Sequence, residues 1–201
     1  MDDLAFILLH ISALTTGITL FMIVGMRRKR EIHKISIALF ASIFCWCSGM
    51  LAESYAISLL NYKGVVFRKL YYAAVGFVSV YIYLLGLSFS AGENINRLNY
   101  LTLIFPVLNM AAIWTNDYHH LYFRNYSLIN SELISGPIHR IQSLYAYPLI
   151  LIGLFYLIFF SIKNAGFFSK QSILITCGII VPLTVDLAFV TKIATFSMYF
   201  E

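Results

Sequence analysis

The chain is organised as six long apolar stretches separated by short polar segments. A membrane-spanning helix needs roughly 20 mostly apolar residues, and each stretch is close to that length. None of them shows the alternation of a membrane β-strand, and backbone groups in hydrocarbon must be hydrogen-bonded within their own segment. The sequence therefore predicts six transmembrane helices, at residues 4–25, 35–60, 70–91, 98–114, 144–162 and 172–190.

The composition agrees with a membrane protein and excludes a water-soluble globule. Hydrophobic residues make up 60% of the chain and charged residues 11%, and the mean hydropathy is +0.81, whereas soluble domains carry roughly 25% charged residues. The net charge is +5, but the basic residues flank the apolar stretches and form no basic face for nucleic acid. The predicted fold class is all-α, a polytopic membrane helix bundle in which residues 1–201 form one domain in the lipid bilayer.

Charges around the first apolar stretch predict its orientation. Asp2 and Asp3 precede the stretch, and four basic residues follow it at 27–30. Cytoplasmic loops are enriched in Lys and Arg, and the first helix usually dominates the topology. We therefore expect an uncleaved helix with its N-terminus outside. The first, third and fifth loops then lie in the cytoplasm, and the long connection 115–143 lies outside.

Two carboxyl groups occur within the predicted spans. At a rise of about 1.5 Å per residue, Glu53 lies roughly 27 Å and Asp186 roughly 21 Å from the cytoplasmic ends of their helices. Asn109, Tyr72 and Tyr145 are expected at the same outer level. Ionisable residues within spans are costly and are functional by default. They predict either a polar pocket open to the outside or carboxyl struts that hold helices together.

The external connection contains His119, His120 and His139. A zinc site needs about four converging ligands, and these spacings match no metal pattern, so we expect hydrogen bonding in the loop and no metal. No nucleophile elbow, phosphate-binding loop or zinc-protease motif is present, so no catalytic residue and no cofactor are predicted. An intramembrane enzyme that uses His119, His120 and Glu53 around a metal is an alternative.

Several short motifs follow one another in an order that is known from one membrane family. They are Trp46 followed by Glu53, the segment 67–72, Phe105 with Pro106, the segment 114–121, His139 with Tyr145 and Tyr147, and Lys170-Gln171 with Pro182. Together they resemble the N-terminal seven-transmembrane region of bacterial sensor histidine kinases, which is also found ahead of diguanylate cyclases. The segment 114–121 is the strongest match. The family commonly has an amide where this chain has Asp186.

The resemblance implies a non-catalytic signal-sensing domain in the bacterial inner (plasma) membrane. A small-molecule or lipid-like ligand would bind in an outward-facing polar pocket, and the domain would act as a homodimer or with a partner membrane protein. The candidate ligand-binding residues are Trp46, Glu53, Tyr72, Asn109, Asn116, His119, His120, His139, Tyr145 and Asp186.

Two questions stay open at the level of sequence. The family continues into a seventh helix and an output domain, so this chain is either the front part of a longer product or a stand-alone membrane interaction protein. A small transporter or channel is the other alternative. It needs a polar path across the whole bilayer, and the inner halves of the predicted helices are nearly all apolar.

Overall fold

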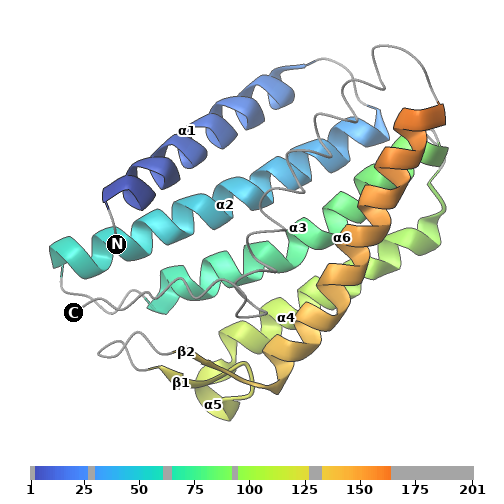
Figure 1. Cartoon of the computed structure of the whole chain (residues 1–201). Helices are drawn as coiled ribbons and strands as arrows, with labels where there is room; N and C mark the ends of the chain where they lie inside the picture. The colour runs from blue at the N-terminus through green and yellow to red at the C-terminus, as the bar shows by residue number, and fades with distance from the viewer. Residues whose placement is uncertain (1–2, 27–29, 61–64, 92–94, 127–132, 164–201) are drawn as a thin grey trace.

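The computed structural model describes residues 3–26, 30–60, 65–91, 95–126 and 133–163. Its long helices are α1 (Asp3–Gly25), α2 (Glu31–Leu60), α3 (Val65–Ala91) and α6 (Pro137–Lys163). Figure 1 shows α1, α2 and α3 side by side, with α6 crossing over α3. Helix α3 packs against α2, α4 and α6 and is the most deeply buried of the long helices. It is therefore the axis around which the other elements are placed.

Glycines allow a close backbone contact where α3 crosses α6. A Cβ atom on Gly86 would lie 2.3 Å from the carbonyl oxygen of Gly153, and one on Gly153 would lie 2.7 Å from that of Ile82. No side chain fits at either position, so the two backbones touch directly. Small residues at such crossings let transmembrane helices pack by van der Waals contact where lipid provides no hydrophobic drive.

The fourth predicted helix is divided in two. A 3-10 helix, η1 (Arg97–Leu103), passes directly into α4 (Ile104–Trp114). Asn96 caps η1, because its side chain accepts a hydrogen bond from the Leu98 amide at 3.1 Å. Pro106 lies in the first turn of α4. Proline has no N–H to donate to the preceding turn, which accounts for the change of helix type at this point.

The connection 115–143 is more structured than its sequence suggested. It contains a short helix, α5 (Asn116–His119), and an antiparallel hairpin of β1 (Phe123–Tyr126) and β2 (Leu133–Ser135). Helix α6 begins at Pro137, before the apolar stretch at 144. Proline is favoured at the first position of a helix because its φ is already helical. The hairpin and α5 lie together at one end of the bundle (Figure 1).

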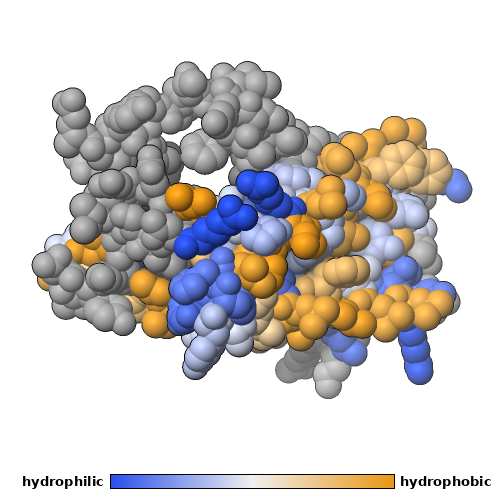
Figure 2. Space-filling view, turned by 90° about the horizontal axis from the view of Figure 1, so that it is seen from below, coloured by the Kyte–Doolittle hydropathy of each residue, from blue (hydrophilic) through white to orange (hydrophobic). Residues whose placement is uncertain are grey.

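Apolar side chains cover much of the outer surface of the helices. Exposed hydrophobic residues run along η1 and α4 and include Leu101, Ile104 and Leu108. Figure 2 shows hydrophilic residues gathered near α5 and the hairpin and again at the opposite end of the visible described face, with mainly apolar residues between them. A surface of this kind is suited to lipid and not to water.

The predicted all-α membrane helix bundle is confirmed. Three helices of the described chain, α2, α3 and α6, are long and apolar enough to cross a membrane, and α1 adds the shorter apolar segment Leu9–Gly25. Helices α2, α3 and α6 extend a few residues beyond the apolar stretches, because polar side chains continue the helix into the interface. The sixth predicted span, 172–190, lies outside the described residues.

Candidate functional site

One face of α3 lies toward α4, α5 and α6 and carries four aligned residues. The first of them is Lys69, and Tyr72, Ala73 and Gly76 follow it by three, four and seven positions. This spacing places all four residues on one side of the helix. Lys69 is bonded to α5, and Gly76 lies beside side chains of α4 and α6. This face defines the candidate site at the end of the bundle that carries the hairpin.

Three polar side chains meet above Gly76. A Cβ atom on Gly76 would lie 3.3 Å from Asn109 Nδ2, 3.5 Å from Gln142 Nε2 and 3.5 Å from the Tyr145 hydroxyl. Asn109 comes from α4, and Gln142 and Tyr145 come from successive turns of α6. The missing side chain at Gly76 leaves room for these groups to gather. We call Gly76, Asn109, Gln142 and Tyr145 the polar cluster.

Two atoms of the polar cluster lack a hydrogen-bond partner among the described residues. They are Asn109 Nδ2 and the Tyr145 hydroxyl, and both are buried. Gln142 is engaged, because its Oε1 accepts a hydrogen bond from the Tyr122 hydroxyl. A buried polar group without a partner costs about 1–3 kcal/mol, so the two atoms need an explanation. A hydrogen-bonding group supplied by a ligand or a water molecule would satisfy them.

Aromatic rings pack together beside the polar cluster, around Tyr72 of α3. Tyr122 and Phe123 are fully buried, and the Tyr72 ring meets Phe123 edge-on at 5.0 Å between centroids. His139 lies 5.8 Å from Tyr72 and 5.5 Å from Tyr122. Tyr122 and Phe123, where the chain enters the hairpin, are thus inserted into the end of the bundle. We call these two residues the aromatic plug.

Asn116 fastens the aromatic plug to α5. Its Oδ1 accepts hydrogen bonds from the backbone amides of Tyr122 at 2.8 Å and Phe123 at 3.0 Å, and its Nδ2 donates to the Phe123 carbonyl at 3.2 Å. Asn116 is itself 1% exposed. All three contacts run to the backbone, so the amide holds the chain independently of the side chains that follow.

The adjacent histidines shape the turn between α5 and the plug. His119 contacts the Thr115 hydroxyl through Nε2 at 3.1 Å and accepts the Leu121 amide through Nδ1 at 3.0 Å. His120 ends α5 with a φ of 53°, a left-handed conformation that is uncommon for residues other than glycine. Among the described residues, no three His, Cys, Asp or Glu side chains group to hold a metal.

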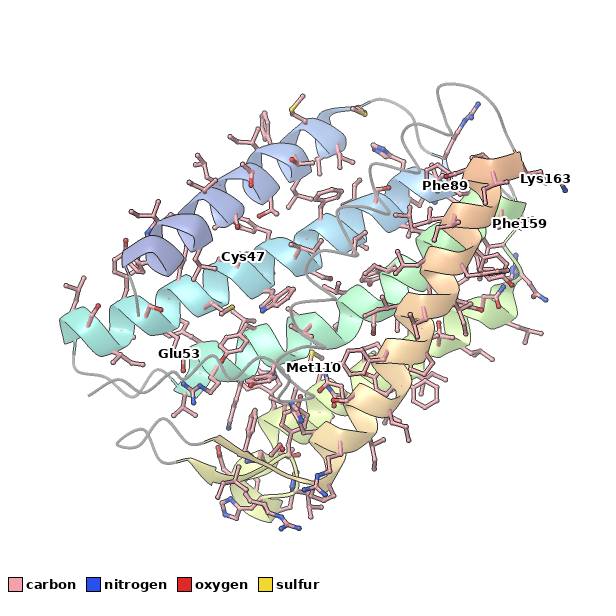
Figure 3. The ribbon with its side chains drawn as sticks, viewed as in Figure 1. Cys47, Glu53, Phe89, Met110, Phe159 and Lys163 are labelled. Atoms are coloured by element: carbon pink, nitrogen blue, oxygen red, sulfur yellow. The ribbon has the colours of Figure 1, made fainter. Side chains whose placement is uncertain are left out.

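A second polar contact of α3 lies on its side toward α2. The Glu53 carboxylate of α2 accepts a hydrogen bond from Arg68 Nε at 2.5 Å, and the Tyr71 hydroxyl also bonds Glu53. Figure 3 shows Glu53 between the ends of α2 and α3. Trp46 lies two turns away on the same side of α2 and is half-buried.

The structure therefore separates the candidate residues into two groups. Asn109 and Tyr145 meet in the polar cluster, with Tyr72, Asn116, His119, His120 and His139 in or beside the plug that covers it. Glu53 belongs to the contact between α2 and α3, and Trp46 lies two turns from it on the same side of α2. Asp186 lies outside the described residues.

Sequence reasoning missed several residues that complete the site. In the sequence, Arg68 and Lys69 stand out only as basic residues at a membrane boundary and as part of the motif at 67–72, and Asp117 and Gln142 fall within the predicted external connection 115–143. The spacing of Gln142 and Tyr145, one helical turn apart, was an available signal. The role of Gly76 was not readable, because it depends on side chains from two other helices.

The comparisons with known proteins give one family. No curated protein and no solved structure matches the chain. The family model described as the N-terminal 7TM region of histidine kinase matches residues 8–201, which is nearly the whole chain. The helical architecture and the apolar surface agree with that match, and such a region is an input domain and is not itself catalytic. The chain belongs to the family of N-terminal seven-transmembrane regions of histidine kinases, which are membrane input domains.

Proposed function

We propose that this chain senses a small-molecule or lipid-like ligand for a two-component histidine kinase and that the ligand binds at the polar cluster. The observation that carries the proposal is the convergence of Asn109, Gln142 and Tyr145 over Gly76, with two of their polar atoms unpartnered among the described residues. A ligand oxygen could accept hydrogen bonds from these donors. The apolar outer surfaces of the helices would face the lipid bilayer.

The proposed location is the bacterial plasma membrane, with several crossings and the N-terminus outside. Basic residues at 27–30, between α1 and α2, support a cytoplasmic first loop. The same orientation places α5, the hairpin and the polar cluster on the external side. A ligand would then approach from outside the cell or from the outer leaflet.

Signal transmission requires two helix arrangements that bind the ligand with different free energies. The polar cluster joins α3, α4 and α6, and α3 touches α6 again at Gly86 and Gly153. A ligand that draws Tyr145 and Asn109 together would change how α6 lies against α3 above this crossing. We propose that this shift is passed to the output domain, in a homodimer or with a partner membrane protein.

The experiment uses a fusion in which one added membrane-spanning helix and a histidine kinase domain follow residue 201. Asn109→Leu removes the unpartnered amide at similar volume, and Tyr145→Phe removes only the hydroxyl. Kinase autophosphorylation in membrane vesicles is measured for both variants, with Leu108→Val on the exposed side of α4 as the matched control.

The proposal predicts that both site variants change the kinase output by about fivefold or more, the lower range of allosteric coupling. The control variant should behave like the parent. Equal output from all four proteins, at equal amounts in the membrane, would contradict the proposal.

A further inference from the structure

Lys69 is a buried cation whose negative partner is a solvent-exposed carboxylate. The residue is 5% exposed, and its Nζ donates a hydrogen bond to Asp117 Oδ2 at 2.6 Å. Burying an ammonium group is costly unless a negative charge accompanies it. The site is therefore built to hold an anion next to α3, three positions before the aromatic ring of Tyr72.

The carboxylate that occupies this site is open to solvent. The Asp117 side chain is 65% exposed, and it belongs to α5, which is four residues long. The neighbouring pair differs in this respect, because the Glu53 side chain is 9% exposed against Arg68. Asp117 reaches Lys69 from the water side, so another carboxylate could take its place without entering through the packed helices.

The surroundings favour an anion with an apolar part. Tyr118, next to Asp117, is 90% exposed, and Trp114 at the end of α4 is 46% exposed. Tyr72, one turn along α3 from Lys69, packs edge-on against Phe123 of the aromatic plug. An apolar group attached to a carboxylate could therefore pack against aromatic side chains near the charge.

We propose that Lys69 is the anion-binding residue of this domain and that it takes a ligand carboxylate in exchange for Asp117. The inference rests on the proposed sensing function and specifies the chemical class of its ligand. Release of Asp117 would free one attachment of α5, the helix that Asn116 ties to the plug. Exchange of carboxylates at Lys69 would thus loosen the cover of the polar cluster.

Asp117 competes as a tethered carboxylate, and short flexible tethers give effective concentrations in the millimolar range. Asp117→Asn removes this competitor and keeps the shape of the side chain. It should therefore increase carboxylate binding, a gain that a misfolded protein would not show. Lys69→Gln should abolish the binding, whereas Lys69→Arg, which keeps the positive charge, should retain it.

The test uses the 201-residue chain in phosphatidylcholine vesicles with Trp46→Phe in every variant. Trp114 is then the only tryptophan, and its fluorescence reports events at α5. Sodium acetate and sodium octanoate are titrated as carboxylate probes, with octanol and octyltrimethylammonium as uncharged and cationic controls.

We expect the half-saturating octanoate concentration to fall about tenfold in Asp117→Asn and the response to vanish in Lys69→Gln. A response to acetate as well indicates a water-soluble ligand, and a response to octanoate alone indicates a lipid-borne one. An unchanged titration in Asp117→Asn and Lys69→Gln would overturn the inference. The kinase fusion with Asn109→Leu is a separate readout, so failure of the sensing proposal would be recognised independently.

Discussion

The Glu53 carboxylate lies 2.5 Å from Arg68 Nε and joins α2 to α3 near the end of the bundle. The two side chains are 9% and 19% exposed, respectively. A buried ion pair contributes little net stability compared with apolar residues, but removal of one partner leaves the other charge unpaired. The pair therefore fixes how α2 and α3 align, and its two members should respond differently to substitution.

Arg68→Met should be the more damaging of the two single substitutions. It leaves the more deeply buried Glu53 without a cation, at a cost of about 3–5 kcal/mol, whereas in Glu53→Gln the longer Arg68 side chain can extend toward water. The double variant should recover much of the loss. Thermal unfolding in detergent of the parent, the two single variants and the double variant gives a double-mutant cycle. Additive losses of stability would contradict a direct coupling between the two residues.

The crossing of α3 and α6 should not tolerate a methyl group. Gly86→Ala would place a Cβ 2.3 Å from the Gly153 carbonyl oxygen, so the helices must separate and lose their packing. Overpacking of this kind costs about 1–3 kcal/mol. Gly25→Ala is the matched control, since no atom lies within 4 Å of its Cβ position. Equal melting temperatures for both variants would show that the crossing is not a close contact.

Asn116 should control the mobility of the plug. Asn116→Ala removes three hydrogen bonds to the segment that enters the hairpin, whereas Asn116→Asp keeps the acceptor for the Tyr122 and Phe123 amides. Hydrogen exchange at these two amides should accelerate strongly in the alanine variant and only partly in the aspartate variant. Full protection in Asn116→Ala would mean that side-chain packing alone holds the plug.

The orientation of the domain can be measured with introduced cysteines. In a background with Cys45, Cys47 and Cys177 replaced by Ser, Tyr118→Cys should react with a membrane-impermeant maleimide added to intact cells, because Tyr118 is 90% exposed beside the hairpin. Lys163→Cys, at the end of α6, should react only after the membrane is opened. The reverse pattern would place the N-terminus inside.

Much of the helical architecture could be predicted from the sequence, because runs such as 35–60 leave a helix as the only way to pair the backbone in lipid. The division of η1 from α4 was less accessible, although Pro106 marked the place. The hairpin was not predicted. Its two strands are four and three residues long, too short for a periodic pattern to identify.

The candidate site was predictable only by residue type. The sequence indicates Asn109 and Tyr145 as polar residues at one depth, and the structure brings them to Gly76. Depth along a helix does not show which neighbouring helix a side chain faces. The sequence therefore groups Glu53 with Asn109 and Tyr145, whereas in the structure Glu53 contacts Arg68. Pairs such as Lys69 with Asp117 join segments 48 positions apart, and no local pattern records such a contact.

The most direct test of the sensing account is the kinase output of the fusion carrying Gly76→Ala. The added methyl group would contact Asn109, Gln142 and Tyr145 together at 3.3–3.5 Å, a tight but tolerable approach that disturbs the polar cluster and little else. The account predicts an output changed by about fivefold or more, with Gly25→Ala at the parent level. A Gly76→Ala fusion that is present in normal amounts and signals like the parent would contradict it.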